Sequence, residues 1–110
     1  MSSQEESQGV DAAKRAGQVA RAMLDGSMHY LIGALELEQL RHEIGAYEND
    51  PDFMPFVAVK MDVESIDNID QLLLDLDHLS SEEGDIIEAS VNWAKSISLT
   101  QCQALADRYN

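Results

Sequence analysis

The chain has 110 residues, which is enough for one compact domain but too few for two independent hydrophobic cores. Its hydrophobic fraction of 45% is that of a globular protein, but its 7 Lys and Arg face 21 Asp and Glu, a formal net charge of −14 at pH 7. So acidic a chain excludes nucleic-acid binding through a basic face and disfavours docking on an anionic membrane.

The chain begins with a polar segment followed by a helical pattern. Residues 1–9 predict a flexible tail, and residues 10–110 are expected to form a single helical domain. From Asp11, a candidate N-cap, apolar residues recur every three or four positions as far as Leu24. The predicted inward face of this helix consists of Ala12, Ala13, Ala16, Val19, Ala20, Met23 and Leu24.

A second amphipathic helix is predicted over residues 28–44, ending at Gly45. Between the two helices, Gly26 suits a left-handed helix end and Ser27 suits a new N-cap. So short a break between two amphipathic helices predicts an antiparallel helical hairpin. The small pair Gly33-Ala34 would let the two backbones approach closely.

The segment 56–63 is the only β-like part of the sequence. Its apolar run and its valines favour a short extended or β segment over a helix. The backbone donors of such a segment require a partner. That partner could be residues 61–66 folded back, a second copy of the chain or another protein, or the segment could be a buried extended connection. A homodimer therefore stays open at this point.

Helical spacing returns after Ser65. A helix is predicted with Ile66, Ile69, Leu73, Leu76 and Leu79 on one face. Residues 80–83 end it and supply a capping box for the next helix, with residues 85–88 as an alternative start. The apolar face of that next helix contains Ile87, Val91 and Ala94.

Residues 98–101 predict one more cap and a short last helix with Leu99, Cys102, Leu105 and Tyr109 facing inward. The expected fold class is therefore mainly α. It consists of a helical hairpin plus two or three further helices, with one short extended segment near residues 56–63.

The residues that could carry chemistry form no complete set. Glu38 and His42 are four residues apart and Asp75 and His78 three apart, too few ligands for a metal centre. Cys102 is flanked by apolar residues and reads as a small core residue rather than a nucleophile. No glycine-rich phosphate loop is present. We expect no enzymatic activity, no metal and no cofactor.

Cysteine content and the N-terminal composition predict the cellular setting. Cys102 is the only cysteine, which excludes an internal disulfide and is typical of a reducing compartment. No apolar stretch has the length of a membrane span, and the polar first residues are unlike a signal peptide. These features predict a cytoplasmic protein.

The distribution of the carboxylates is the most informative feature of the sequence. The 27 residues from Asp62 to Glu88 contain ten acids and no Lys or Arg. One interpretation is a solvated surface that keeps the protein soluble. The other is that the negative field attracts and holds a basic partner, because self-repulsion of this kind costs stability. The candidate partner-binding carboxylates are Glu48, Asp50, Asp52, Asp67, Asp70, Asp75, Asp77, Glu82, Glu83 and Asp85.

A binding surface also requires an apolar anchor, because charges at the rim of an interface mainly set the association rate. The candidate anchors are Tyr47, Phe53, Phe56 and Trp93, each of which could equally be a core residue.

Several short segments resemble a family of small acidic bacterial proteins of unknown function. They are Ala22-Met23-Leu24-Asp25-Gly26, Gly33-Ala34, Leu40-Arg41-His42-Glu43, the segment 50–58, Trp93-Ala94 and Cys102. The resemblance covers about two thirds of the chain and departs from the family pattern over residues 61–79. It implies a bacterial cytoplasmic setting and assigns no chemistry.

The general properties of the chain are similar to those of immunity proteins that neutralise nuclease toxins. The leading hypothesis is a non-catalytic inhibitor that occludes a basic, nuclease-like protein with an acidic surface. The alternative is a small helical adaptor or regulatory subunit whose acidity serves only solubility. A third is an oligomeric structural protein that pairs through residues 56–63.

Overall fold

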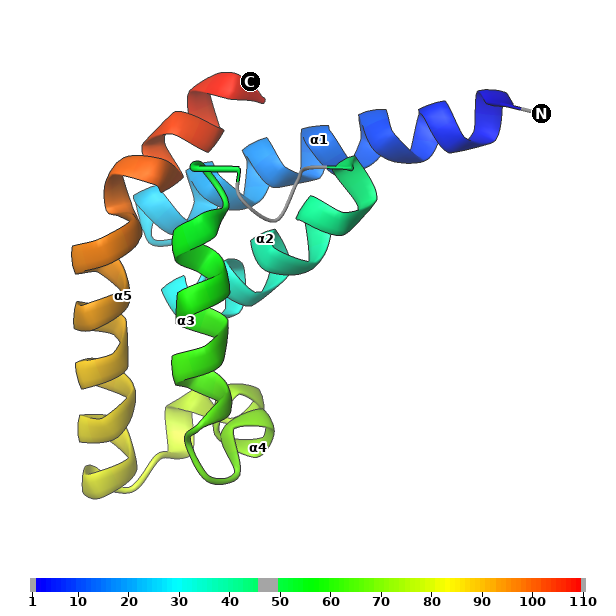
Figure 1. The fold of residues 1–110 in the computed structure, drawn as a ribbon. Helices are drawn as coiled ribbons and strands as arrows, with labels where there is room; N and C mark the ends of the chain where they lie inside the picture. The colour runs from blue at the N-terminus through cyan, green and yellow to red at the C-terminus, as the bar shows by residue number, and fades with distance from the viewer. Residues whose placement is uncertain (1, 46–49, 110) are drawn as a thin grey trace.

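The computed structural model describes residues 2–45 and 50–109, and all regular structure within these ranges is helical. The elements are α1 (Ser2–Asp25), α2 (Tyr30–Ile44), α3 (Met54–Glu64), α4 (Ile69–Leu74), the 3-10 helix η1 (Leu76–His78) and α5 (Ser81–Arg108). Helices α3 and α5 lie side by side, with α1 across one end of the pair and α4 at the other (Figure 1). The predicted mainly α class is confirmed.

Helix α1 starts earlier than the sequence predicted. Its backbone is helical from Ser2, so α1 includes residues 2–9, and the flexibility expected of this segment stays a prediction. Asp11 therefore lies inside the helix and is not its N-cap. The predicted inward face is largely confirmed, because Ala16, Val19 and Ala20 are fully buried.

The link between α1 and α2 turns at Gly26, whose φ of +84° is the predicted left-handed conformation. The N-cap of α2 is His29 rather than Ser27, because the His29 ring accepts the backbone N–H of Leu31. At its other end, α2 stops before Gly45 as predicted. Helices α1 and α2 pack closely, since a Cβ added to Gly33 would lie 2.3 Å from Met23 Cγ.

The predicted extended segment at residues 56–63 is wrong, because this stretch forms most of α3. Phe56, Val59 and Val63 are all fully buried, and their spacing of three and four places them on one helical face. Pro55 lies in the first turn, where a missing N–H costs nothing. The helix satisfies its backbone groups internally, so no partner strand is required, and tertiary burial outweighs the weak β-propensity of the valines.

The helix predicted after Ser65 is shorter than expected. Only Ile69–Leu74 forms α4, and η1 follows it. The predicted capping box that starts α5 is confirmed: Glu83 N–H donates to Ser80 Oγ at 3.1 Å, and Ser80 N–H donates to Glu83 Oε1 at 2.9 Å.

The predicted break at residues 98–101 is wrong, because α5 runs unbroken from Ser81 to Arg108. Ser98 does not cap a new helix. Its hydroxyl donates to the carbonyl of Ala94 and accepts a hydrogen bond from the buried Tyr30 hydroxyl at 2.7 Å. Leu99, predicted to face inward, is 41% exposed, whereas Cys102 and Leu105 are fully buried.

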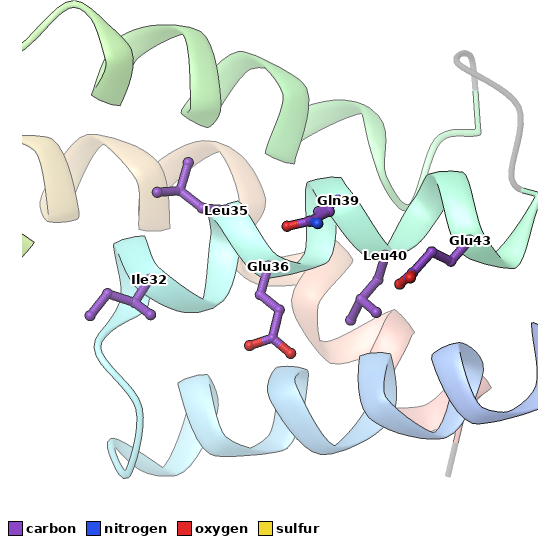
Figure 2. A pocket seen from close by; sticks show the side chains of 6 residues that line it. All are labelled: Ile32, Leu35, Glu36, Gln39, Leu40 and Glu43. Carbon is purple, nitrogen blue, oxygen red and sulfur yellow. The ribbon is translucent and has the colours of Figure 1, made fainter. Parts of the chain in front are cut away.

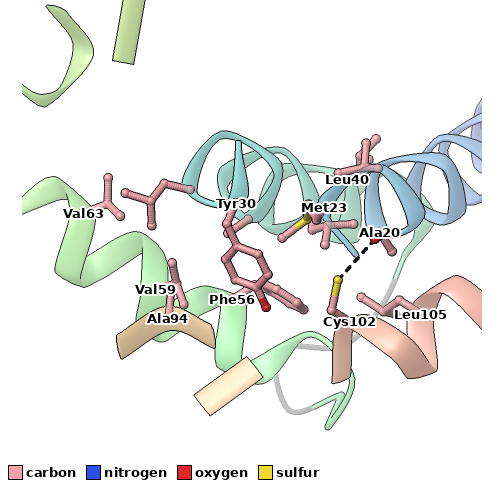
Figure 3. Close-up of a cluster of buried hydrophobic side chains, with 14 of the residues drawn as sticks. Ala20, Met23, Tyr30, Leu40, Phe56, Val59, Val63, Ala94, Cys102 and Leu105 are labelled. Atoms are coloured by element: carbon pink, nitrogen blue, oxygen red, sulfur yellow. Dashed lines mark hydrogen bonds between the residues drawn. The ribbon is translucent and has the colours of Figure 1, made fainter. Parts of the chain in front are cut away.

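The hydrophobic core lies where α1, α2, α3 and α5 meet (Figure 3). Tyr30 of α2, Phe56 of α3 and Cys102 of α5 are among its members. At the α1 side of the core, a Cβ added to Gly17 would lie 2.1 Å from the carbonyl oxygen of Tyr109, so the end of α5 rests directly on the backbone of α1.

We predict that Gly17→Ala lowers the free energy of unfolding by about 1–3 kcal/mol, because the added methyl must push two backbones apart. Gly84→Ala is the matched control, since nothing lies within 4 Å of its Cβ position. Alanine there is expected to raise stability by up to about 1 kcal/mol through helix propensity. Urea unfolding measures both changes. Equal stabilisation by the two substitutions would contradict the close approach.

We predict that His29 makes stability depend on pH. Partial burial, and to a lesser extent Lys95, lowers the pKa of His29 from 6.5. The folded chain therefore binds this proton less readily than the unfolded chain, so the contribution is complete above about pH 6.5 and is lost as the pH falls toward the lower folded pKa. His29→Asn keeps a capping acceptor but does not titrate there.

The measurement is the free energy of urea unfolding of the wild type and of His29→Asn at about pH 7.5 and about pH 5.5. The wild type should lose more stability than the variant over this interval. An identical loss in the two proteins would contradict the prediction.

Candidate protein-binding site

The acidic stretch of the sequence gathers at one end of the molecule. It forms the last turns of α3, the turn after it, α4, η1 and the first turns of α5, which lie together at the bottom of Figure 1. We call its carboxylates the acidic end; they are Asp62, Glu64, Asp67, Asp70, Asp75, Asp77, Glu82, Glu83, Asp85 and Glu88.

Four of these carboxylates have internal roles. Asp62 accepts a hydrogen bond from Ser90 Oγ at 2.8 Å, which joins α3 to α5, and Glu64 lies 3.9 Å from Lys60 Nζ. Asp75 pairs with His78, and Glu83 belongs to the capping box. These groups help to hold the local structure.

The remaining six carboxylates of the acidic end are exposed and form no ion pair with any other residue that the structure describes. They come from the α3–α4 turn, α4, η1 and α5, so the fold concentrates uncompensated negative charge over several elements. They are Asp67, Asp70, Asp77, Glu82, Asp85 and Glu88.

The acids predicted upstream do not join this surface. Asp50 and Asp52 precede α3, at the opposite end of that helix. Arg108 Nη1 donates to the Asp50 carboxylate at 3.3 Å and to the Asp52 carboxylate at 3.1 Å. They fasten the end of α5 to the start of α3 and are separated from Asp67 by the length of α3, which is about 16 Å at 1.5 Å per residue. Glu48 lies outside the described residues.

The predicted anchors separate into two groups. Phe53 and Phe56 are fully buried, so they are core residues and not anchors for a partner. Tyr47 lies outside the described residues. Trp93 is 41% exposed on α5, close to the acidic end, and is the predicted anchor that a partner can reach.

Trp93 lines a groove between α3 and α5 that sequence reasoning missed. We call this the Trp93 groove; it has a volume of about 300 Å³ and is lined by Asp62, Ile66, Ile86, Ala89, Ser90 and Trp93. A second hollow of about 460 Å³ shares Ile66 and Ile86 and extends the groove toward Asp67, Glu82 and Glu83. The sequence signal that could have revealed one wall of the groove is the spacing of three and four residues, which places Ile86, Ala89, Ser90 and Trp93 on one face of α5.

A different hollow lies along α2, beside α1 (Figure 2). It has a volume of about 430 Å³ and includes Ile32, Leu35 and Glu36, the last of which pairs with Arg15 of α1. A neighbouring hollow of about 330 Å³, the α2–α4 groove, is lined by Ile32, Leu35, Asp70, Leu73 and Leu74. Leu74 is 87% exposed there.

Of the two histidine–carboxylate pairs noted in the sequence, the Glu38–His42 pair includes a carboxylate that also contacts two basic side chains. Glu38 is buried, and its carboxylate lies 3.2 Å from Arg41, 3.3 Å from His42 and 3.6 Å from Lys60. Glu38 thereby links α2 to α3. Residues 2–45 and 50–109 contain no group of three or more His, Cys, Asp or Glu side chains arranged to hold a metal ion.

Cys102 lies in the core, as predicted, and its thiol donates to the Ala20 carbonyl at 3.5 Å (Figure 3). Burial raises the pKa of Cys102 to about 11. The thiol is therefore protonated at neutral pH and shielded from solvent.

Among the described residues, no helix combines the length and the apolarity that crossing a membrane requires.

Comparison of the chain with known protein families, curated proteins and solved structures found no match. The resemblance to small acidic bacterial proteins therefore stays a prediction.

We predict that Cys102 does not react with a thiol reagent in the native protein at about pH 8, where a pKa of about 11 leaves only about one thiolate in a thousand. In urea, one thiol per chain should react at once. Full labelling of the native protein within seconds would contradict the burial of Cys102.

Proposed function

We propose that this protein is a non-catalytic protein-binding module, and specifically a toxin-neutralising immunity or inhibitor protein. It occludes a basic, nuclease-like partner with its acidic end. The observation that carries the proposal is the set of six exposed, uncompensated carboxylates from Asp67 to Glu88, gathered at one end of the molecule.

The mechanism follows from the charge that a nuclease requires. A nuclease active site is basic because it holds phosphate, so a dense carboxylate surface competes for the same Lys and Arg side chains. The field of the acidic end accelerates the encounter, and this acceleration weakens with salt, because the Debye length is about 8 Å at physiological ionic strength.

Occlusion also requires contacts that slow dissociation. An apolar groove next to the carboxylates is formed by Trp93, Ile86 and Ile66, which is the usual arrangement of an apolar anchor inside a polar rim.

The proposal also includes an antiparallel hairpin of α1 and α2, which serves as the scaffold that holds α3 and α5. A reducing, bacterial cytoplasmic setting fits the single, unpaired Cys102.

One observation favours the second candidate, a helical adaptor. The α2–α4 groove exposes Leu74 together with Leu73, Ile32 and Leu35, and it could seat a partner without help from most of the acidic end. Binding through that groove would be lost in Leu74→Ser and would depend little on salt.

We predict that neutralising three carboxylates, Asp67→Asn, Asp77→Asn and Asp85→Asn together, slows association with the nuclease roughly tenfold at low salt. The unfolding free energy should hold or rise, because like charges at the acidic end repel one another. Stopped-flow association with a basic nuclease that the protein captures in a pull-down, followed by inhibition of its nucleic-acid hydrolysis, measures the effect.

The matched control removes the same charge elsewhere, with Asp11→Asn, Glu43→Gln and Asp107→Asn, three exposed residues away from the acidic end. It should slow association much less. Equal rates for the two triple variants, or full inhibition that ignores salt, would contradict the proposed role of the acidic end.

A further inference from the structure

We propose that the Trp93 groove binds one basic amphipathic α-helix of the partner protein. The apolar face of that helix lies on Ile66, Ile86 and Trp93, and its Lys and Arg residues face Asp62, Asp67 and Glu82. This inference rests on the proposed function, in that it names the part of the basic partner that the acidic end receives.

The dimensions and the walls of the groove fit a short helix. From Glu82 to Trp93 it follows α5 for about 16 Å, the length of a helix of about three turns. The Ser90–Asp62 hydrogen bond at 2.8 Å joins its two walls, so the groove is formed before a partner arrives. Ala89 and Ser90 have small side chains and lie between the larger Ile86 and Trp93, so a large apolar side chain of the partner can insert there.

Backbone chemistry favours a helix over an extended peptide. The walls are mainly α3 and α5, whose backbone groups beyond the first turn of α5 are bonded within their own helices. In the turn between the walls, Ser65 and Ile66 also donate internally. An extended peptide would find little backbone to pair with, whereas a helix satisfies its own backbone and presents only side chains.

Charge selects the sign of the occupant. Asp62, Asp67, Glu82 and Glu83 line the groove and its extension, and the stretch Asp62–Glu88 contains no Lys or Arg. A second copy of this chain would bring the same carboxylates face to face. Lys and Arg flanking an apolar face complement the groove, and a guanidinium or ammonium can also stack on the exposed Trp93 ring.

The test uses two synthetic Lys/Leu peptides of identical composition and about 14 residues, one with Leu at helical three–four spacing and one with Leu scattered around the helix. Trp93 is the only tryptophan, so its fluorescence reports occupancy of the groove directly. The amphipathic peptide should shift the Trp93 emission to the blue and should bind at least about tenfold tighter than the scattered one.

Two serine variants locate the binding. Ile86→Ser should weaken binding of the amphipathic peptide about tenfold. Leu99→Ser is the matched control, because Leu99 is 41% exposed against 43% for Ile86 and lies about 140° around α5 from it. It should leave binding unchanged. Circular dichroism verifies that both variants are folded.

Each of three results overturns the inference: equal binding of the two peptides, equal effects of the two serine variants, or self-association in sedimentation that Ile86→Ser abolishes. If the equal binding of the two peptides also weakens with salt, the acidic end remains a surface for basic chains although the helix-binding groove is excluded. The proposed function itself falls only if the carboxylate variants leave association with the nuclease unchanged.

Discussion

The packing of three helices against one unbroken helix, α5, is the constraint on which the rest of the structure depends. Helices α1, α2 and α3 all contact α5, whose buried residues include Ala94, Cys102 and Leu105. Ser98 lies in the middle of α5, and its hydrogen bond with Tyr30 at 2.7 Å satisfies two buried hydroxyls at once. Because α5 runs without a break past the core, its first turns extend beyond α3 toward α4, where the charge is concentrated (Figure 1).

The two ends of α5 differ in how their neighbouring carboxylates are paired. At the C-terminal end, Arg108 forms ion pairs with Asp50 and Asp52, and the ring of Tyr109 packs on Phe53, so part of the negative charge is offset and the end of α5 is fastened to the start of α3. At the N-terminal end the carboxylates have no Lys or Arg of their own stretch to pair with. The C-terminal end of α5 therefore stabilises the fold. The N-terminal end, next to the Trp93 groove, has the carboxylates that are available to form ion pairs with a basic partner.

Two predictions failed for the same physical reason. The valine-rich segment 56–63 was expected to be extended, and Ser98 was expected to start a new helix, because both expectations relied on local preferences of single residues. Phe56, Val59 and Val63 already had the three–four spacing of a helix, and Pro55 marked its first turn. The hydroxyl of Ser98 could be placed only once Tyr30, 68 positions away in sequence, was known to face it.

The sequence by itself determined the helical class, the turn at Gly26, the end of α2 at Gly45, the capping box at Ser80 and the burial of Cys102. Each follows from interactions within a few residues or from apolar periodicity. It also determined where the negative charge lies along the chain. Only the tertiary structure separated Asp50 and Asp52 from the acidic end, buried Phe53 and Phe56, and placed Ile66 beside Trp93. These outcomes depend on which surfaces of distant helices meet, and no local pattern encodes that pairing.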